Sequence, residues 1–243
     1  MPLEIVTVPC LKDNYAFLAH DAATGATAVV DVPAAAPILN ALARHGWKAS
    51  HILITHHHDD HIAGLKALAA ATGARVIGAA ADAHRLPRLD EKVAEGDIIR
   101  LGMEEGRVID VPGHTVGHVA YHFPGSAAVF TGDSLMALGC GRVFEGTMAQ
   151  MWASLGKLAA LPPDTLFLDA EAFYAAAKPH MQLALRAEQQ DVEHSAWVQA
   201  LADVAAAVAA EKGVSAPVAG NATEAAKAIA ASLLSGQRAA VLL

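Results

Sequence analysis

Short runs of β-branched and apolar residues, separated by turn-forming residues, dominate the first part of the chain. Runs of this kind, bounded by Gly, Pro, Asn and Asp, are typical of strands. We therefore expect strands at residues 4–8, 16–20, 26–32, 51–55, 75–78, 98–101, 107–111, 119–122, 127–131 and 166–168.

Three stretches among these strands have the composition and the ends of helices. The first opens at Pro33 and runs to about residue 45, the second covers residues 62–72, and the third covers residues 151–160. Glycine after a helix and proline in its first turn are favoured positions, so Gly46 and Gly73 set the predicted ends. Strands that alternate with helices and then follow one another predict a layered α/β domain over residues 1–174.

The remaining residues, 175–243, have a different pattern and are almost all helix-forming. Trp197, Leu201, Val204 and Val208 recur at helical spacing, and Thr223 is a candidate N-cap of a further helix. We expect this part of the chain to form a separate C-terminal helical region.

Composition narrows the classes of function. The formal net charge is −8 and no Lys/Arg cluster provides a basic face, which argues against a nucleic-acid partner. No apolar run is long enough for a membrane span, and the first residues lack the pattern of a secretory signal, so we expect a cytoplasmic protein. Cys10 and Cys140 are expected to be reduced, and the sequence does not predict an oligomeric state.

The most informative segment is Thr55-His56-His57-His58-Asp59-Asp60-His61, which follows a predicted buried strand. Residues two apart in an extended segment point the same way, so His56 and His58 can face one metal ion. Asp60 and His61 lie where the loop turns into a helix and can face a second point nearby. His57 and Asp59 alternate with these residues and are expected to point away from the metal. Neutral imidazole and carboxylate are ligands for Zn, Fe and related ions.

Two segments further along the chain strengthen this interpretation. Pro112-Gly113-His114-Thr115-Val116-Gly117-His118 presents His114 after a strand, and Phe130-Thr131-Gly132-Asp133-Ser134 places Asp133 at the end of another. A lone Thr-Gly-Asp is a weak signal, but its combination with the histidine loop is a strong one. His118 lies beside a strand and is expected to be a packed histidine with satisfied hydrogen bonds.

Together these segments resemble the metallo-β-lactamase superfamily and, within it, the glyoxalase II (hydroxyacylglutathione hydrolase) family. The resemblance covers residues 3–175 and implies an αββα sandwich with the metal ions at the edge of its two sheets. It also implies that His56, His58 and His114 bind one ion, that Asp60 and His61 bind the other, and that Asp133 bridges both. In this scheme Asp60 also orients or deprotonates the attacking water, and the helical residues 175–243 lie on the substrate side.

The chain departs from the family where the second ion acquires its last ligand. A histidine is usual a few residues after the Leu-Pro-Pro-Asp-Thr stretch, and Glu171 stands at that position here. An additional carboxylate makes the cluster more neutral and moves its preference toward harder ions. We therefore expect one or two divalent ions, with Zn first and Fe or Mn as alternatives. A second interpretation is that Glu171 points elsewhere and the second position is weak or empty, with Asp169 or His180 as substitutes.

The positions that recognise glutathione in the family also differ. The resemblance assigns substrate binding to residues 142, 144 and 173. Arg142 keeps the expected cation, whereas Phe144 and Phe173 replace tyrosines and lose two hydroxyl groups. The basic residues of the family's C-terminus have no clear counterpart apart from Arg238. We therefore expect a small acyl-thiol substrate for which S-lactoylglutathione is not optimal.

Three functional hypotheses follow from the sequence. The first is a metal-dependent hydrolase of thioesters. The second is a mononuclear iron enzyme similar to persulfide dioxygenases, which share this fold and use two histidines and an aspartate. The third is a relative that binds a metal or ligand without turnover.

Overall fold

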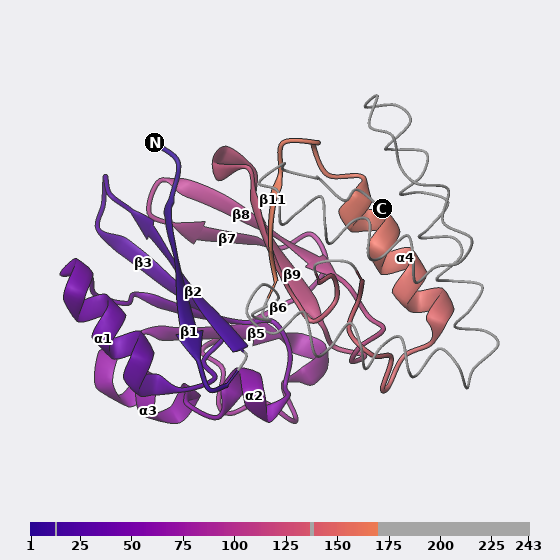
Figure 1. Cartoon of the computed structure of the whole chain (residues 1–243), viewed down its shortest axis with the longest axis horizontal. Helices are drawn as coiled ribbons and strands as arrows, with labels where there is room; N and C mark the ends of the chain where they lie inside the picture. Colours follow the sequence, from indigo (N-terminus) through magenta and orange to yellow (C-terminus); the bar gives the residue numbers. More distant parts are fainter. Residues whose placement is uncertain (13, 137–138, 170–243) are drawn as a thin grey trace, which may run out of the picture. The chain divides into compact units, whose positions relative to one another are not determined.

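The computed structural model describes residues 1–12, 14–136 and 139–169, and these form two β-sheets with helices on their outer sides (Figure 1). The predicted helices in residues 175–243, and the site candidates Glu171 and Phe173, lie outside the described residues. The strands are β1 (Glu4–Cys10), β2 (Asn14–Asp21), β3 (Ala26–Val30), β4 (His51–Ile54), β5 (Arg75–Ala79), β6 (Glu91–Val93), β7 (Ile98–Leu101), β8 (Glu104–Asp110), β9 (Val119–Phe123), β10 (Ala128–Gly132) and β11 (Leu166–Asp169). The α-helices are α1 (Ala35–His45), α2 (Asp59–Ile62), α3 (Leu65–Thr72) and α4 (Met148–Ala159), and short 3-10 turns cover Ala80–Asp82 and Pro124–Ser126.

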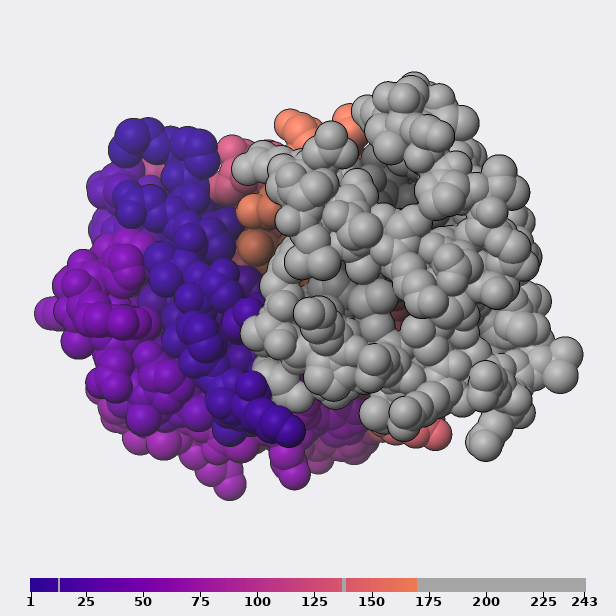
Figure 2. Space-filling view, viewed as in Figure 1, coloured from indigo at the N-terminus to yellow at the C-terminus, as the bar shows by residue number. Residues whose placement is uncertain are grey.

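The strands are divided between two sheets in chain order. The first sheet has the order β1-β2-β3-β4-β5-β6, and the second has the order β11-β10-β9-β8-β7. Strands β3 to β6 run parallel to one another, whereas β1, β2 and β3 are antiparallel. Strand β1 is an edge of the first sheet and occupies an exposed face of the molecule, coloured indigo in Figure 2. Its Pro9 is exposed, as expected for a residue that cannot donate to a neighbouring strand.

Three apolar clusters define four layers. Alternate residues of the first sheet, such as Leu18 and Ile52, pack under α1 and α3, whereas their neighbours Phe17 and Leu53 pack against the second sheet. On the other side of the second sheet, a smaller cluster of Val111, Ala120, Val129 and Leu158 packs beneath α4. Because side chains alternate between the two faces of a strand, each sheet contributes to two clusters. The predicted αββα sandwich is thus confirmed.

The helix ends follow from local chemistry. Gly46 adopts a left-handed conformation, with φ of 69°, and ends α1. The Thr147 hydroxyl accepts a hydrogen bond from the amide of Gln150, and the side-chain oxygen of Gln150 accepts one from the amide of Thr147. This capping box starts α4 three residues before the predicted start.

The predicted helix over residues 62–72 corresponds to α3, which begins three residues later, and Ile62 belongs instead to the short helix α2, which was not predicted. The amide of Gly64 donates to the carbonyl of Val32 (2.9 Å), so the chain leaves the helical path between α2 and α3. This tertiary contact could not be deduced from the local pattern. The short strand β6 was also missed, because a three-residue strand carries little periodicity.

The polar segments identified in the sequence all follow strands. The histidine loop follows β4, the loop with His114 follows β8, and Asp133 follows β10. Within the described residues, no helix is both long and apolar enough to cross a membrane.

One buried hydrogen bond connects the two sheets directly beneath the histidine loop. The hydroxyl of Tyr121, on β9, donates to the carbonyl of Ile54 at the end of β4 (2.7 Å), and the Tyr121 side chain is fully buried.

We expect Tyr121→Phe to lower the free energy of unfolding by about 1–2 kcal/mol, because a buried acceptor loses its partner. Urea denaturation measures this change. Tyr15→Phe is the matched control, since Tyr15 packs in the same cluster and its hydroxyl makes no such bond to a described residue. An equal loss in both variants would contradict the assignment.

Candidate metal centre

Three imidazoles from two loops meet at the edge of the sheets. Nδ1 of His58 lies 3.1 Å from Nε2 of His56 and 2.9 Å from Nε2 of His114. His56 and His114 are buried, and His58 is half-buried. These three nitrogens lie within 4.8 Å of one another, which is the arrangement needed to coordinate one ion.

A second group shares His56 with the first. It contains His56, His61 and Asp133, whose candidate ligand atoms also lie within 4.8 Å of one another. Nε2 of His61 is 3.1 Å from Oδ1 of Asp133, and the other carboxylate oxygen of Asp133 is 3.3 Å from Nε2 of His114. Asp133 therefore lies between the two groups.

Buried polar atoms at this point lack hydrogen-bond partners. Nε2 of His61 and Oδ1 of Asp133 are both buried, and neither forms a hydrogen bond of acceptable geometry with the described residues. A buried polar atom without a partner is costly, and a coordinated cation removes that cost. The donor set of imidazole and carboxylate fits a divalent transition metal.

In three of these rings, the nitrogen that faces away from the cluster forms a hydrogen bond with an oxygen atom. Nδ1 of His61 donates to Oδ2 of Asp31 (2.9 Å), and Nδ1 of His114 donates to the carbonyl of Arg142 (2.7 Å). Nδ1 of His56 lies 3.0 Å from the hydroxyl of Thr55, which itself donates to Asp31 (2.8 Å). With the N–H directed outward, each ring presents its Nε2 lone pair to the common centre, as in metal-binding histidines generally.

Asp31 organises the histidine loop from below. It is buried and follows β3 with φ of 57°, a conformation that Asp tolerates better than most residues. Its carboxylate accepts hydrogen bonds from the backbone amide and the hydroxyl of Thr55 as well as from the ring of His61. The Asp31 carboxylate thus fixes both the start of the histidine loop at Thr55 and the orientation of the His61 imidazole.

Asp133 is positioned by the residue before it and by His118. Gly132 has φ of 51°, and a Cβ atom there would lie 2.6 Å from the Thr55 hydroxyl, so only glycine fits. The amide of Asp133 donates to Nε2 of His118 (3.1 Å), while Nδ1 of His118 donates to the carbonyl of Val119 (3.2 Å). His118 is therefore a buried histidine with both nitrogens satisfied.

Electrostatics favours neutral imidazoles at the first group. Burial, followed by the neighbouring histidines, lowers the pKa of His56 well below its ordinary value, and burial followed by His114 lowers the pKa of His58. At His61 burial opposes the charged form, but Asp31 and Asp133 together raise its pKa. At Asp133 the cost of burial is outweighed by His61, which lowers the pKa of the carboxyl group. Neutral imidazole and ionised carboxylate are the forms that bind metals.

Asp60 occupies a more open position than the other candidates. Its side chain is 51% exposed, and its Oδ2 lies 3.7 Å from Nε2 of His61 and accepts a hydrogen bond from Nδ2 of the Asn14 side chain (3.2 Å). It belongs to neither of the two compact groups. His57 points away from them toward Asp82, as predicted, whereas Asp59 lines the adjacent cavity.

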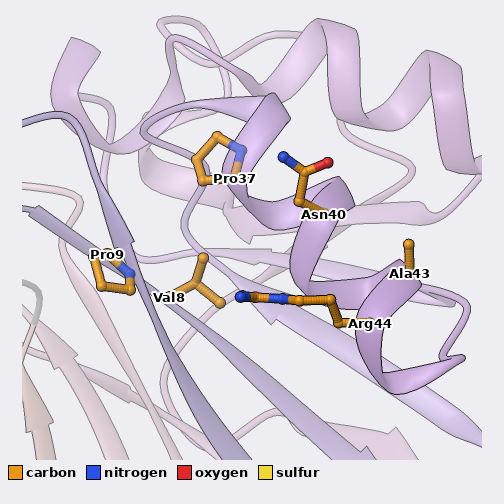
Figure 3. Close-up of a pocket in the computed structure, with 6 residues that line it drawn as sticks. All are labelled: Val8, Pro9, Pro37, Asn40, Ala43 and Arg44. Atoms are coloured by element: carbon orange, nitrogen blue, oxygen red, sulfur yellow. The ribbon is translucent and has the colours of Figure 1, made fainter.

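The cluster opens into a cavity of about 520 Å3. Arg142 and Phe144 line its rim, with the guanidinium carbon of Arg142 5.2 Å from the centre of the Phe144 ring. A second depression, of about 560 Å3, lies between β1 and α1 and is lined by Val8, Pro9, Pro37, Asn40, Ala43 and Arg44 (Figure 3). It contains none of the predicted site residues, so the cavity at the cluster is the candidate for chemistry.

Comparison with known proteins agrees with this geometry. The family model of the metallo-beta-lactamase superfamily matches residues 21–170, which is more than half of the chain. This chain belongs to the metallo-beta-lactamase superfamily. Membership and the His/Asp cluster together imply a divalent-metal centre.

Several members of the superfamily are closely similar in sequence. A hydroxyacylglutathione hydrolase of Cereibacter sphaeroides is 67% identical over 175 residues, which is 72% of this chain and 69% of that protein. A hydroxyacylglutathione hydrolase of Jannaschia sp. (strain CCS1) is 61% identical over 189 residues, 78% of this chain and 73% of that protein.

A solved structure with the same fold contains two iron ions. TTHA1623, described in a di-iron-bound form, is 26% identical and has a TM-score of 0.59, covering 69% of this chain and 91% of that chain. This metallo-beta-lactamase fold therefore holds two metal ions in at least one similar protein.

The sequence did not single out several residues that hold the cluster in place. Asp31 follows the apolar strand β3 as Asp133 follows β10, so a carboxylate at a strand end was an available signal. Asp82 and Arg85 lie in segments with no recognisable local pattern, and only the folded structure places them, together with Glu145, beside the histidine loop.

The buried position of His118 generates a prediction about pH. Burial is the largest cause that lowers the pKa of His118, from its ordinary value to about 3. Between about pH 6.5 and pH 3, this histidine therefore binds a proton in the unfolded chain but not in the folded chain. The free energy of unfolding of the metal-free protein should fall as the pH falls through this window, by at most roughly 1.4 kcal/mol per pH unit from this residue.

Urea denaturation with a chelator present, between pH 7 and about pH 4, measures that dependence. His56 and His58 contribute in the same direction, so His118→Gln should make the dependence less steep without abolishing it. An identical slope for wild type and variant would show that His118 does not carry this proton linkage.

Proposed function

We propose that this protein is a metal-dependent hydrolase of thioesters, acting on a glutathione thioester or a similar small acyl-thiol. The observation that carries the proposal is the convergence of imidazole nitrogens and Asp133 at the base of an open cavity. The similar proteins named hydroxyacylglutathione hydrolase support the reaction class.

The ligand assignment follows the two groups of the cluster. His56, His58 and His114 are proposed to hold one ion, and His61 the other, with Asp133 between them. Asp60 is proposed as a further ligand of the second ion because its carboxylate faces His61. Glu171 stays a candidate from its sequence position alone. Zinc is the first expectation, and Fe or Mn remain alternatives because carboxylates contribute to the second position.

The chemistry requires an activated water and a polarised carbonyl group. Bound divalent ions supply both, since they lower the pKa of water and act as Lewis acids. The protein's own contribution is to orient the reactants. Asp60 is exposed to the cavity and fixed by Asn14, so its carboxylate can orient the attacking water and accept its proton. A thiolate is a good leaving group, which removes the need for a strong general acid.

Substrate recognition is proposed to use the rim of the cavity. Arg142 offers a cation for a carboxylate of the substrate, and Phe144 offers an exposed apolar ring beside it. Phe173 is assigned to the same role by sequence position. The absence of the tyrosine hydroxyls predicts weaker binding of glutathione than in relatives that retain them, so smaller or different acyl-thiols belong in any substrate panel.

The two alternative functions are less well supported. The similar proteins are named hydroxyacylglutathione hydrolase, and this favours hydrolysis over persulfide oxidation and over a non-catalytic role. The clustered second group of His56, His61 and Asp133 also provides more donors than a mononuclear iron centre needs. A cytoplasmic location stays a prediction.

The central test combines metal analysis with a thioester panel. We expect purified wild type to contain one or two divalent ions per chain and to hydrolyse S-D-lactoylglutathione or another thioester in a metal-dependent manner. His114→Ala should lower activity by more than about 100-fold, since losing an outer contact of a metal ligand already costs about 10- to 100-fold.

His45→Ala is the matched control, because His45 is exposed and its ring lies tilted against Trp47 instead of joining the cluster. Wild-type protein that binds no ion, or that consumes oxygen with a persulfide but hydrolyses no thioester, would overturn the proposal.

The rim residue Phe144 allows a separate test of the substrate class. We expect Phe144→Tyr to lower the KM for S-D-lactoylglutathione by about fivefold, the equivalent of one hydrogen bond worth roughly 1 kcal/mol, with little change in kcat. Phe144→Leu, which removes the ring without adding a hydroxyl, is the control. Steady-state kinetics on both variants is the measurement, and an unchanged KM in Phe144→Tyr would exclude glutathione contact at this position.

A further inference from the structure

A network of four side chains lies beside the metal centre without joining it. It consists of His57 in the histidine loop, Asp82 and Arg85 after β5, and Glu145 before α4. Asp82 is fully buried, and the side chains of His57, Arg85 and Glu145 are only 16%, 25% and 26% exposed. None of these residues belongs to the two candidate ligand groups.

One end of the network fixes the histidine loop. Nδ1 of His57 lies 3.0 Å from Oδ2 of Asp82, and the His57 ring contacts that of His58 edge-on, with 4.9 Å between ring centres. His57 stands between His56 and His58, so anchoring its side chain on one side directs its two neighbours to the other.

The other end fixes the segments around His114. Glu145 accepts a hydrogen bond from the amide of Val116 (2.9 Å), two residues after His114. The neighbouring amide of Phe144 donates to the carbonyl of His114 (3.2 Å), and the carbonyl of Arg142 accepts from the His114 ring. The position of residues 142–145 therefore determines where the His114 imidazole points.

Arg85 connects these two ends. Its guanidinium donates one hydrogen bond to Asp82 and another to Glu145, which also approaches Nε2 of His57 at 3.5 Å. The hydrogen bond from Arg85, followed by that from Val116, lowers the pKa of Glu145, so the carboxylate remains ionised. A planar guanidinium can hold two carboxylates at a fixed separation, which a flexible ammonium cannot do.

The two loops also meet directly at Asp82. A Cβ atom added to Gly117 would lie 2.2 Å from Oδ1 of Asp82, so the backbone after Val116 is packed against this carboxylate. The histidine loop, the segment after β5 and the His114 loop thus share one anchoring point. The same anchor holds both segments that contribute to the group of His56, His58 and His114.

We propose that Arg85 is a positioning residue, which holds the histidine loop and the His114 loop at the separation that the first metal ion requires. The inference rests on the proposed function, because it assumes that these three histidines bind an ion. Arg85 contacts neither substrate nor metal in this role and acts through Asp82 and Glu145. Its function is to form the three-histidine group before an ion arrives, so that binding energy is not spent on ordering two loops.

The test is a titration of the chelator-treated 243-residue chain with Co2+, in which the visible absorption of the bound ion measures binding. We expect Arg85→Ala to raise the Kd of the first Co2+ by about 10- to 100-fold and to alter the intensity of the absorption bands. Arg85→Lys should recover only part of this loss, since one ammonium cannot span both carboxylates. Arg100→Ala is the matched control, because Arg100 pairs with Glu105 on an exposed part of the second sheet.

Melting temperatures of the metal-free proteins separate positioning from general stability. If Arg85→Ala lowers the metal-free melting temperature but leaves the Co2+ Kd and spectrum unchanged, the residue is only structural and the inference is wrong. If wild type itself binds no Co2+, the proposed function fails together with the inference. A weakened Kd in Arg85→Ala with unchanged binding in Arg100→Ala supports the inference.

Discussion

The structure depends on imidazole nitrogens that are held close together. Nδ1 of His58 lies about 3 Å from Nε2 of His56 and from Nε2 of His114, because the three rings are oriented by surrounding contacts. Such an arrangement is repulsive unless a proton or a cation lies between the nitrogens. A divalent ion turns this repulsion into coordination, so the free energy of metal binding offsets the cost of bringing these nitrogens together.

The surrounding fold supplies the contacts that keep the rings in place. Asp31, at the end of β3, and the carbonyl of Arg142 accept the outward N–H groups of His61 and His114. Tyr121 connects the second sheet to the strand that precedes the histidine loop. Each contact comes from a different strand or loop, and the four-layer packing is what brings them to one edge of the sandwich. This dependence explains why a small ligand set needs a large, well-packed domain.

The cluster and the cavity rim have different physical requirements. The cluster needs fixed geometry, and its residues are buried and connected by hydrogen bonds. The rim is open, with Phe144 59% exposed, and the Phe144 ring meets the cluster only edge-on, against the rings of His58 and His114. Under the proposed function, the rim is therefore where a phenylalanine in place of tyrosine would modify substrate preference while the ligand set stays the same.

The sequence pattern by itself determined a layered α/β class, most of the strands and the segments that carry His56, His58, His61, His114 and Asp133, whereas the αββα arrangement was implied by the resemblance to the superfamily. These features are local, since alternation of apolar residues and the spacing within a loop are visible along the chain. Only the tertiary structure decided that α2 and α3 are separate helices, that Asp31 orients His61, and that Arg85 connects Asp82 to Glu145. These contacts join residues far apart in sequence, and single charged residues in irregular segments leave no periodic pattern from which such pairing could be inferred.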